Sequence, residues 1–129
     1  MDAPTFENLD LACAKVGKDI ANSSSDDLEK VITDALAVLE EQGLYAIFLY
    51  LENAVSGTKK KELAKGLHKF LKVTPQQAPL LSDNADVFTS LQQMAKDLDK
   101  LLLARDLVRQ TLVYARYHAR VPQTREVQT

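Results

Sequence analysis

Apolar residues recur at steps of three and four along almost the whole chain, and this spacing constrains the fold more than any other feature. Leu9, Cys13, Val16 and Ile20 begin the pattern near the N-terminus. Only four glycines and four prolines interrupt the 129 residues, so long helices are expected. Residues 44–54 could form a strand by propensity, but no other segment offers a partner strand. The sequence therefore predicts an all-α fold, a single compact bundle of five or six helices.

The expected helices are separated by polar or helix-breaking residues. Ser25 and Thr58 are candidate N-caps of the second and fourth helices. The helix over residues 44–54 is apolar nearly all round, which favours a buried central position. Residues 1–120 are expected to form one helical domain, followed by a polar, frayed tail over 121–129. The predicted helices span 6–21, 26–42, 44–54 and 59–72, then a final stretch that is capped within Ser82-Asp83-Asn84, can kink near Asp97 and ends at Arg120.

Composition excludes several classes of protein. Apolar residues make up 46% and charged residues 26%, which is typical of a globular domain rather than of a disordered chain. A single cysteine, Cys13, excludes an internal disulfide framework and favours the reducing cytoplasm. The longest wholly apolar run, Leu44 to Leu51, has eight residues, whereas a membrane-spanning helix needs about 20. Acidic residues in the first twenty positions also argue against a signal peptide.

The formal net charge of −2 hides an uneven distribution. Residues 1–52 carry eleven acidic and three basic side chains, whereas residues 53–129 carry seven acidic and thirteen basic ones. A sequence pI near 5.7 argues against a general nucleic-acid-binding protein. A local basic surface remains compatible with that value, because salt screens charges beyond about 8 Å.

Two rows of basic side chains follow the helical period. At about 100° per residue, four arginines of the final stretch share a sector about 60° wide and form a row about 22 Å long. The opposite half of that stretch is largely apolar, which places the arginines on the expected solvent side. Lysines of residues 59–72 form the second row, with His68 at its edge. The candidate RNA-backbone-binding residues are Arg105, Arg109, Arg116, Arg120, Lys61, Lys65, Lys69 and Lys72.

Rows of this kind can contact a nucleic-acid backbone. Charges one helical turn apart lie about 6 Å from each other, close to the spacing of phosphates along a strand. Such contact is independent of base sequence and sensitive to salt. The alternative is that both rows only solvate their helices, as most charge runs do. No stacking platform for bases is evident, because Tyr45, Tyr50, Tyr114 and Tyr117 lie in apolar stretches and are expected in the core.

Residues with catalytic or metal-binding chemistry are few and scattered. Cys13, His68 and His118 do not have the spacing of a zinc site, and no glycine-rich phosphate loop is present. Cys13 is expected to be a buried, inert thiol and His118 a partly buried histidine. His68 lies among lysines and could relay phosphoryl groups in a helical module, but a surface histidine is the favoured interpretation. Neither a cofactor, nor a metal, nor enzymatic activity is expected.

Two segments together resemble a known family. Residues 41–51 read EQGLYAIFLYL, a glycine–leucine step followed by an apolar helix, and residues 103–119 read LARDLVRQTLVYARYHA. Their order and separation are similar to those in the small α-helical subunit of type III-B (Cmr) CRISPR RNA-guided effector complexes. The resemblance extends loosely over residues 28–120.

The resemblance implies a non-catalytic role in antiviral defence. Small subunits of this kind stack in several copies and line the channel that holds the guide RNA–target duplex, and other subunits perform cleavage. The implied partners are other subunits of the effector complex, further copies of this chain in a head-to-tail stack, and the backbones of guide and target RNA, without a membrane. The acidic residues of 1–52 could meet the basic surface of the next copy. A helical protein–protein adaptor that binds no nucleic acid is the alternative.

Overall fold

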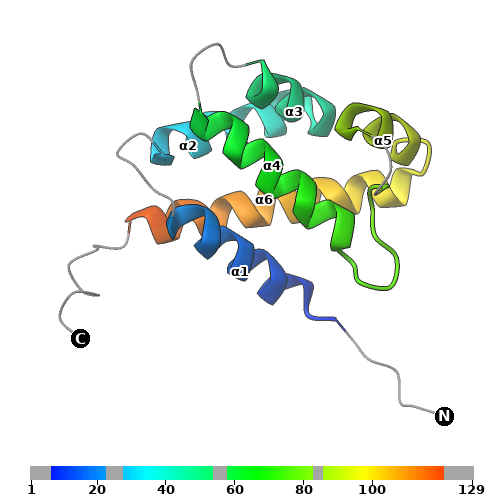
Figure 1. Ribbon diagram of the computed structural model, residues 1–129, viewed down its shortest axis with the longest axis horizontal. Helices are drawn as coiled ribbons and strands as arrows, with labels where there is room; N and C mark the ends of the chain where they lie inside the picture. Colours follow the sequence, from blue (N-terminus) through cyan, green and yellow to red (C-terminus); the bar gives the residue numbers. More distant parts are fainter. Residues whose placement is uncertain (1–6, 23–27, 54–57, 83–85, 121–129) are drawn as a thin grey trace.

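The computed structural model describes residues 7–22, 28–53, 58–82 and 86–120, and within them every regular element is an α-helix (Figure 1). In chain order the helices are α1 (Leu9–Asn22), α2 (Leu28–Gln42), α3 (Leu44–Glu52), α4 (Thr58–Val73), α5 (Val87–Met94) and α6 (Leu98–Arg120). The predicted all-α bundle of five or six helices is confirmed. Three predicted features lie outside the described residues, namely the Ser25 cap, the Asp83-Asn84 part of the second cap segment and the 121–129 tail.

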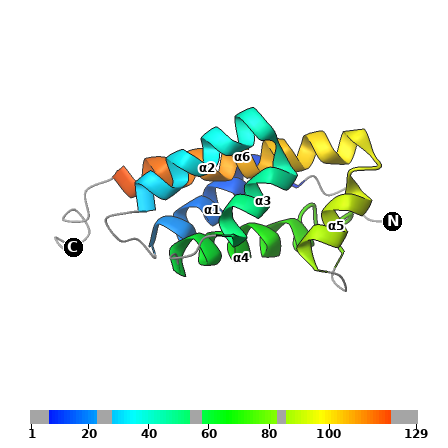
Figure 2. The same ribbon diagram turned by 90° about the horizontal axis from the view of Figure 1, so that it is seen from above.

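The longest helix, α6, organises the bundle. α1 runs beside α6 in the same direction, since Cys13 lies next to Leu107 and Gly17 lies next to Ala115. α2 lies along another side of α6 in the opposite direction, as its salt bridges to α6 show. Figure 2 shows α4 on the face opposite α2 and α6, with α1 and α3 between these two layers.

The core is built from the apolar faces that periodicity predicts. On α4, the apolar residues spaced by three and four are buried, namely Leu63, Leu67, Phe70 and Leu71. The partly buried Val31 and Val38 flank the inward face of α2, whose centre is fully buried. Burial of this apolar surface is the main source of stability in a bundle that has a single cysteine and hence no internal disulfide. The largest fully buried side chains are Phe48, Ile32, Leu39, Ile47, Leu51, Leu67, Leu71 and Leu112.

α1 approaches α6 closely at Gly17, which the helical periodicity does not predict. A Cβ atom placed on Gly17 would lie 2.8 Å from the Ala115 backbone nitrogen, 2.8 Å from Tyr114 Cβ and 2.9 Å from the Thr111 carbonyl oxygen. Contacts this short do not occur between real Cβ atoms and backbone, so only glycine fits at position 17. The two backbones therefore touch where Gly17 crosses α6.

α3 corrects the prediction of a fully buried central helix. Its inner side is buried at Ile47 and Phe48, but Tyr45 is 39% and Leu49 48% exposed. The prediction was wrong because α3 packs against α2, α4, α5 and α6 through its inner side (Figure 1). Tyr45 lies at the edge of this contact, with its ring 5.4 Å from that of Phe88, and Leu49 faces outward. Tyr117, also predicted in the core, is 60% exposed near the end of α6.

The predicted final stretch is two helices, with the break near the predicted kink. Asp86, rather than a residue of Ser82-Asp83-Asn84, is the N-cap of α5, and its Oδ1 accepts a hydrogen bond of 3.0 Å from the Thr89 backbone N–H. Asp97 Oδ1 accepts from the backbone N–H groups of Asp99 (3.1 Å) and Lys100 (3.3 Å) at the start of α6. A carboxylate at each start satisfies N–H groups that a helix leaves unpaired. Thr58, predicted as an N-cap, is the first residue of α4.

Candidate nucleic-acid interface

The arginine row of α6 lies along the contact with α2, with Arg109 and Arg120 exposed and Arg105 and Arg116 half-buried. Two acidic residues of α2 pair with arginines of this row. Arg109 Nε lies 3.4 Å from Glu40 Oε1, and Arg120 Nε pairs with Glu29 Oε2 at 2.5 Å. Arg109 Nη2 also lies 2.7 Å from Asp106 Oδ1. The acidic N-terminal half of the chain thus meets the basic C-terminal half within one molecule, because opposite charges face each other across the α2–α6 contact.

The spacing of the charges fits this pairing. Glu29 and Glu40 are eleven residues apart on α2, and Arg109 and Arg120 are eleven residues apart on α6. Eleven residues correspond to about three helical turns, so each pair lies on one face of its helix. Two antiparallel helices with equal spacing bring both pairs into contact together. Sequence reasoning missed these two acidic partners, although the equal spacing was a signal for them.

Arg105 and Arg116 are half-buried in the same interface. Arg105 Nη2 donates a hydrogen bond of 3.3 Å to the Glu40 carbonyl oxygen. The Nε atoms of both arginines are buried and have no hydrogen-bond partner. Arg116 lines a groove of about 420 Å³ between α2 and α6. The other lining residues are Thr33, Leu36, Ala37, Glu40, Arg109 and Val113.

The lysine row of α4 is an accessible basic surface. We define the α4 lysine face as Lys61, Lys65 and Lys69, whose side chains are exposed and have no ion-pair partner among the described residues. Lys72, the fourth predicted residue of this row, is half-buried and has an interaction partner. The structure therefore keeps three of the eight candidate residues on one open face.

The fold forces the α4 lysine face outward. Leu63, Leu67 and Leu71 are buried on the opposite side of α4, against the rest of the bundle. α4 contains six lysines and a single acidic residue, Glu62, so it is the most basic helix described. Lys60 is held differently, with its Nζ 4.8 Å above the centre of the Tyr50 ring. That cation–π contact ties the start of α4 to α3.

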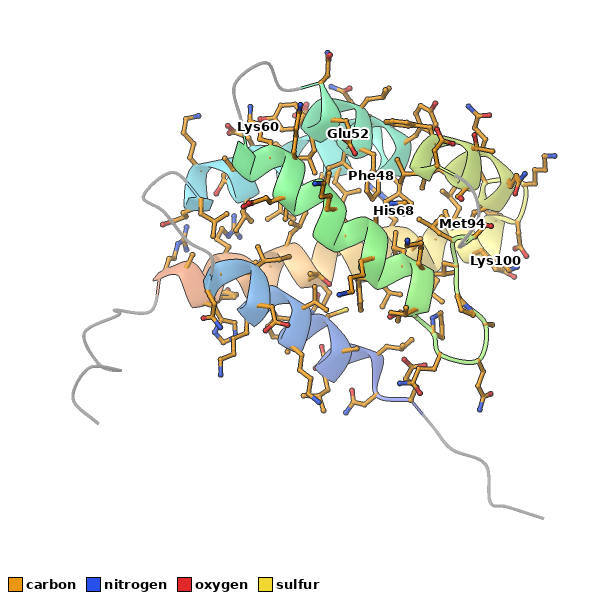
Figure 3. The ribbon with its side chains drawn as sticks, viewed as in Figure 1. Phe48, Glu52, Lys60, His68, Met94 and Lys100 are labelled. Carbon is orange, nitrogen blue, oxygen red and sulfur yellow. The ribbon has the colours of Figure 1, made fainter. Side chains whose placement is uncertain are left out.

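His68 is half-buried rather than the surface histidine that the sequence favoured. Its Nε2 is buried without a hydrogen-bond partner, so this nitrogen is not accessible to a phosphoryl donor. Burial lowers the pKa of His68, and the charge of Lys72 lowers it further, against the opposing charges of Glu52 and Asp86. Figure 3 shows His68 on α4, with Glu52 at the end of α3. The burial of this nitrogen therefore argues against a phosphorelay role for His68.

Acidification is expected to destabilise the fold through His68. Its folded-state pKa lies below the ordinary value of 6.5, so the unfolded chain binds the proton more readily. The contribution of His68 to stability is therefore full above about pH 6.5 and is lost as the pH falls toward the folded-state pKa. Urea unfolding at about pH 7 and pH 5 should give a smaller pH-dependent loss for His68→Gln than for the wild type. An identical loss in both proteins would contradict the assignment.

The remaining candidate groups do not form a reactive site. Cys13 is buried, burial raises the pKa of its thiol, and its Sγ lies 3.5 Å from the Leu107 carbonyl oxygen. The prediction of a buried thiol is confirmed, and His118 is partly buried as predicted. Among the residues that the structure describes, no three histidine, cysteine or acidic side chains are grouped so that they could hold a metal ion.

Within the described helices, none is both long and apolar enough to cross a bilayer. Comparison of the chain with protein-family models, with curated proteins and with solved structures found no match.

Proposed function

We propose that the chain is a non-catalytic subunit that holds nucleic-acid backbone along the α4 lysine face. The observation that carries this proposal is the exposure of Lys61, Lys65 and Lys69 on one side of α4 without ion-pair partners among the described residues. They occupy positions i, i+4 and i+8 and cover about 12 Å along the helix. Point charges spaced by about 6 Å match successive phosphates and read no base.

The resemblance to small subunits of type III-B complexes indicates which nucleic acid this is. In the proposed complex, the α4 lysine face contacts the guide RNA–target duplex, and other subunits of the complex and further copies of this chain position it. The arginine row has a structural role in this proposal. Because Arg109 and Arg120 pair with α2, they stabilise the helix contact rather than bind RNA.

Neutralising two lysines of this face is expected to weaken RNA binding. Lys65→Gln combined with Lys69→Gln removes two phosphate contacts, so the slope of log K against log salt should fall by about 2. Binding near physiological salt should weaken about 10-fold or more, because each lost contact also removes counterion release. The measurement is a titration of fluorescent RNA duplex at several salt concentrations between about 50 and 200 mM, on the protein together with whatever subunits co-purify.

The matched control changes the same net charge elsewhere. Lys15 and Lys18 are exposed on α1, and their double substitution by glutamine should leave the salt slope unchanged. Equal weakening in both double variants would mean that net charge alone matters, and would contradict a defined lysine face. Charge reversal at Arg109 is a poorer test, because a glutamate there would lie against Glu40 and Asp106 and would disturb the fold.

Recovery of the protein from its native cells tests the complex itself. A tagged chain should co-purify with other effector subunits and with short RNAs that share one repeat-derived end. Mass spectrometry of the proteins and sequencing of the RNA provide both readouts. Recovery of a different protein and no RNA would contradict the proposal.

That contrary outcome would favour a helical adaptor. Leu98 and Leu102 lie one turn apart at the start of α6 and are 64% and 49% exposed. Paired exposed leucines are typical of a small protein-binding surface, although single exposed apolar side chains are common. An adaptor of this kind would retain its partner in high salt and would bind no RNA.

A further inference from the structure

A groove runs between α1 and α4, two helices that lie side by side in opposite directions (Figure 1). At one end, Glu7 Oε1 accepts a hydrogen bond of 2.8 Å from the Gln76 backbone N–H, which ties the start of α1 to the residues that follow α4. The groove has a volume of about 360 Å³ and is lined by residues of these two helices alone. The lining residues are Val16, Asp19, Ile20, Glu62, Gly66, Lys69, Phe70 and Val73.

The aliphatic walls of this groove are accessible from outside. Val73 is 56% exposed on the α4 side, and Val16 and Ile20 are half-buried on the α1 side. Aliphatic side chains that gather in a groove are typical of a contact with another protein, whereas single exposed ones are common everywhere. The groove also borders the α4 lysine face, because Lys69 belongs to both.

Gly66 keeps the α4 side of the groove open. A glycine inside a helix lowers the stability of that helix relative to alanine. No contact among the described residues requires glycine here, since a Cβ atom at this position would have only Ile20 Cγ1 nearby, at 4.0 Å. Gly17 is the contrast, because the backbone of α6 fills the space where its Cβ would lie. The missing side chain of Gly66 instead leaves room for a backbone from outside the chain to approach α4.

Two carboxylates flank the groove from opposite helices. Asp19 on α1 and Glu62 on α4 are exposed, and neither has an ion-pair partner within the described part of the chain. Lys69 is the only basic lining residue, so the lining carries a net negative charge. An occupant that presents cationic side chains at its edge therefore complements this groove.

We propose that the α1–α4 groove receives an amphipathic helix of a partner protein. Aliphatic side chains of that helix, spaced by three and four, enter between Val16, Ile20 and Val73. Its backbone passes over Gly66, and a lysine or arginine beside the aliphatic stripe pairs with Asp19 or Glu62. The groove needs no residue of the RNA contact, so this proposal stands whether or not the chain binds RNA.

A synthetic helical peptide is the probe of this chemistry. It has about 18 residues, with leucines at positions i, i+3, i+4 and i+7 and lysines on both sides of that stripe. The matched peptide has glutamate at every lysine position. On titration of the full chain to about 1 mM peptide, backbone amide shifts should move saturably at residues 12–22 and 62–73. The lysine peptide should bind at least about 10-fold more tightly than the glutamate peptide.

Three outcomes of this titration would overturn the proposal. They are the absence of saturable shifts, saturable shifts confined to other residues, and equal binding of the two peptides. Dilution of the chain without peptide is the fourth measurement. Concentration-dependent shifts at the same residues would mean that a second copy of this chain occupies the groove, which would also contradict the proposal.

Substitutions at Gly66 separate binding from stability. Gly66→Ala should weaken binding of the lysine peptide about 10-fold although it stabilises the free protein, because the added methyl group holds the two helices apart. Gly66→Leu places a larger side chain in the groove and should abolish binding. Unchanged binding by both variants would show that no helix passes over this position.

Charge substitutions test the edge of the groove. Asp19→Asn with Glu62→Gln should remove the preference for the lysine peptide over the glutamate peptide. Glu41→Gln with Asp99→Asn changes the net charge equally at exposed positions outside the groove and should keep the preference. Equal loss of preference in both double variants would mean that net charge alone attracts the peptide.

A last pair of substitutions separates this proposal from RNA binding. Lys61 and Lys65 belong to the α4 lysine face but do not line the groove. Lys61→Gln with Lys65→Gln should therefore not weaken peptide binding, although it lowers the salt slope of RNA binding. Weaker peptide binding in this variant would place the peptide on the lysine face instead of in the groove.

Discussion

Replacing Gly17 with alanine is expected to lower the free energy of unfolding by about 2 kcal/mol, although alanine is the better helix former. The added methyl group would lie within 2.9 Å of the Thr111 carbonyl oxygen and 2.8 Å from the Ala115 nitrogen. Backbone atoms cannot rotate away as a side-chain end can, so α1 must move off α6. The cost of that displacement exceeds the propensity gain of about 1 kcal/mol.

Gly66 on α4 is the matched control for this prediction. A Cβ placed there has only Ile20 Cγ1 nearby, at 4.0 Å, which is ordinary van der Waals contact. Gly66→Ala should therefore stabilise the protein by up to about 1 kcal/mol. Urea unfolding followed by far-ultraviolet circular dichroism measures both variants, since the chain has no tryptophan to report fluorescence. Opposite signs for the two substitutions are expected, and destabilisation of equal size would refute the close contact at Gly17.

Phe48→Ala is expected to have the largest effect on stability, a loss of about 4 kcal/mol. Phe48 is fully buried and is the bulkiest of the fully buried side chains. It lies on the inner side of α3, a helix of nine residues that is too short to persist without packing. The substitution removes the transfer free energy of the ring and leaves a cavity. A domain of this size is usually stable by about 5–15 kcal/mol, so the variant should unfold at markedly lower urea concentration.

Leu49→Ala tests the same helix from its outer side. Leu49 follows Phe48 in the chain but is 48% exposed, so its truncation should cost less than about 1 kcal/mol. Similar losses for both substitutions would mean that α3 is buried all round, as its composition alone suggested. The pair thus separates the sequence-based expectation for this helix from the arrangement in the structure.

The sequence was sufficient for the helices and for most of the core, for a local reason. The residues that α4 buries are spaced by three and four, and any packed helix must hide such a face. The break near Asp97 was also visible, because a carboxylate capping N–H groups three residues on is a local signal. Residues 44–51 are all apolar, so their sequence does not indicate which side of the helix faces the core. Only the contacts with other helices decide which side is exposed.

The same distinction between local sequence and long-range packing applies to the candidate interface. The sequence determined that α4 has a basic side opposite an apolar one, since a helix fixes the direction of each side chain relative to the next. Whether a basic side stays open depends on what lies against it, which local sequence does not state.

The tertiary structure decided that the arginines of α6 meet α2, because antiparallel packing brings Glu29 and Glu40 to Arg120 and Arg109. It also decided that Gly17 must be glycine, because α1 and α6 touch there. Periodicity thus determined the helices and their faces, and long-range packing selected which of these faces stay exposed.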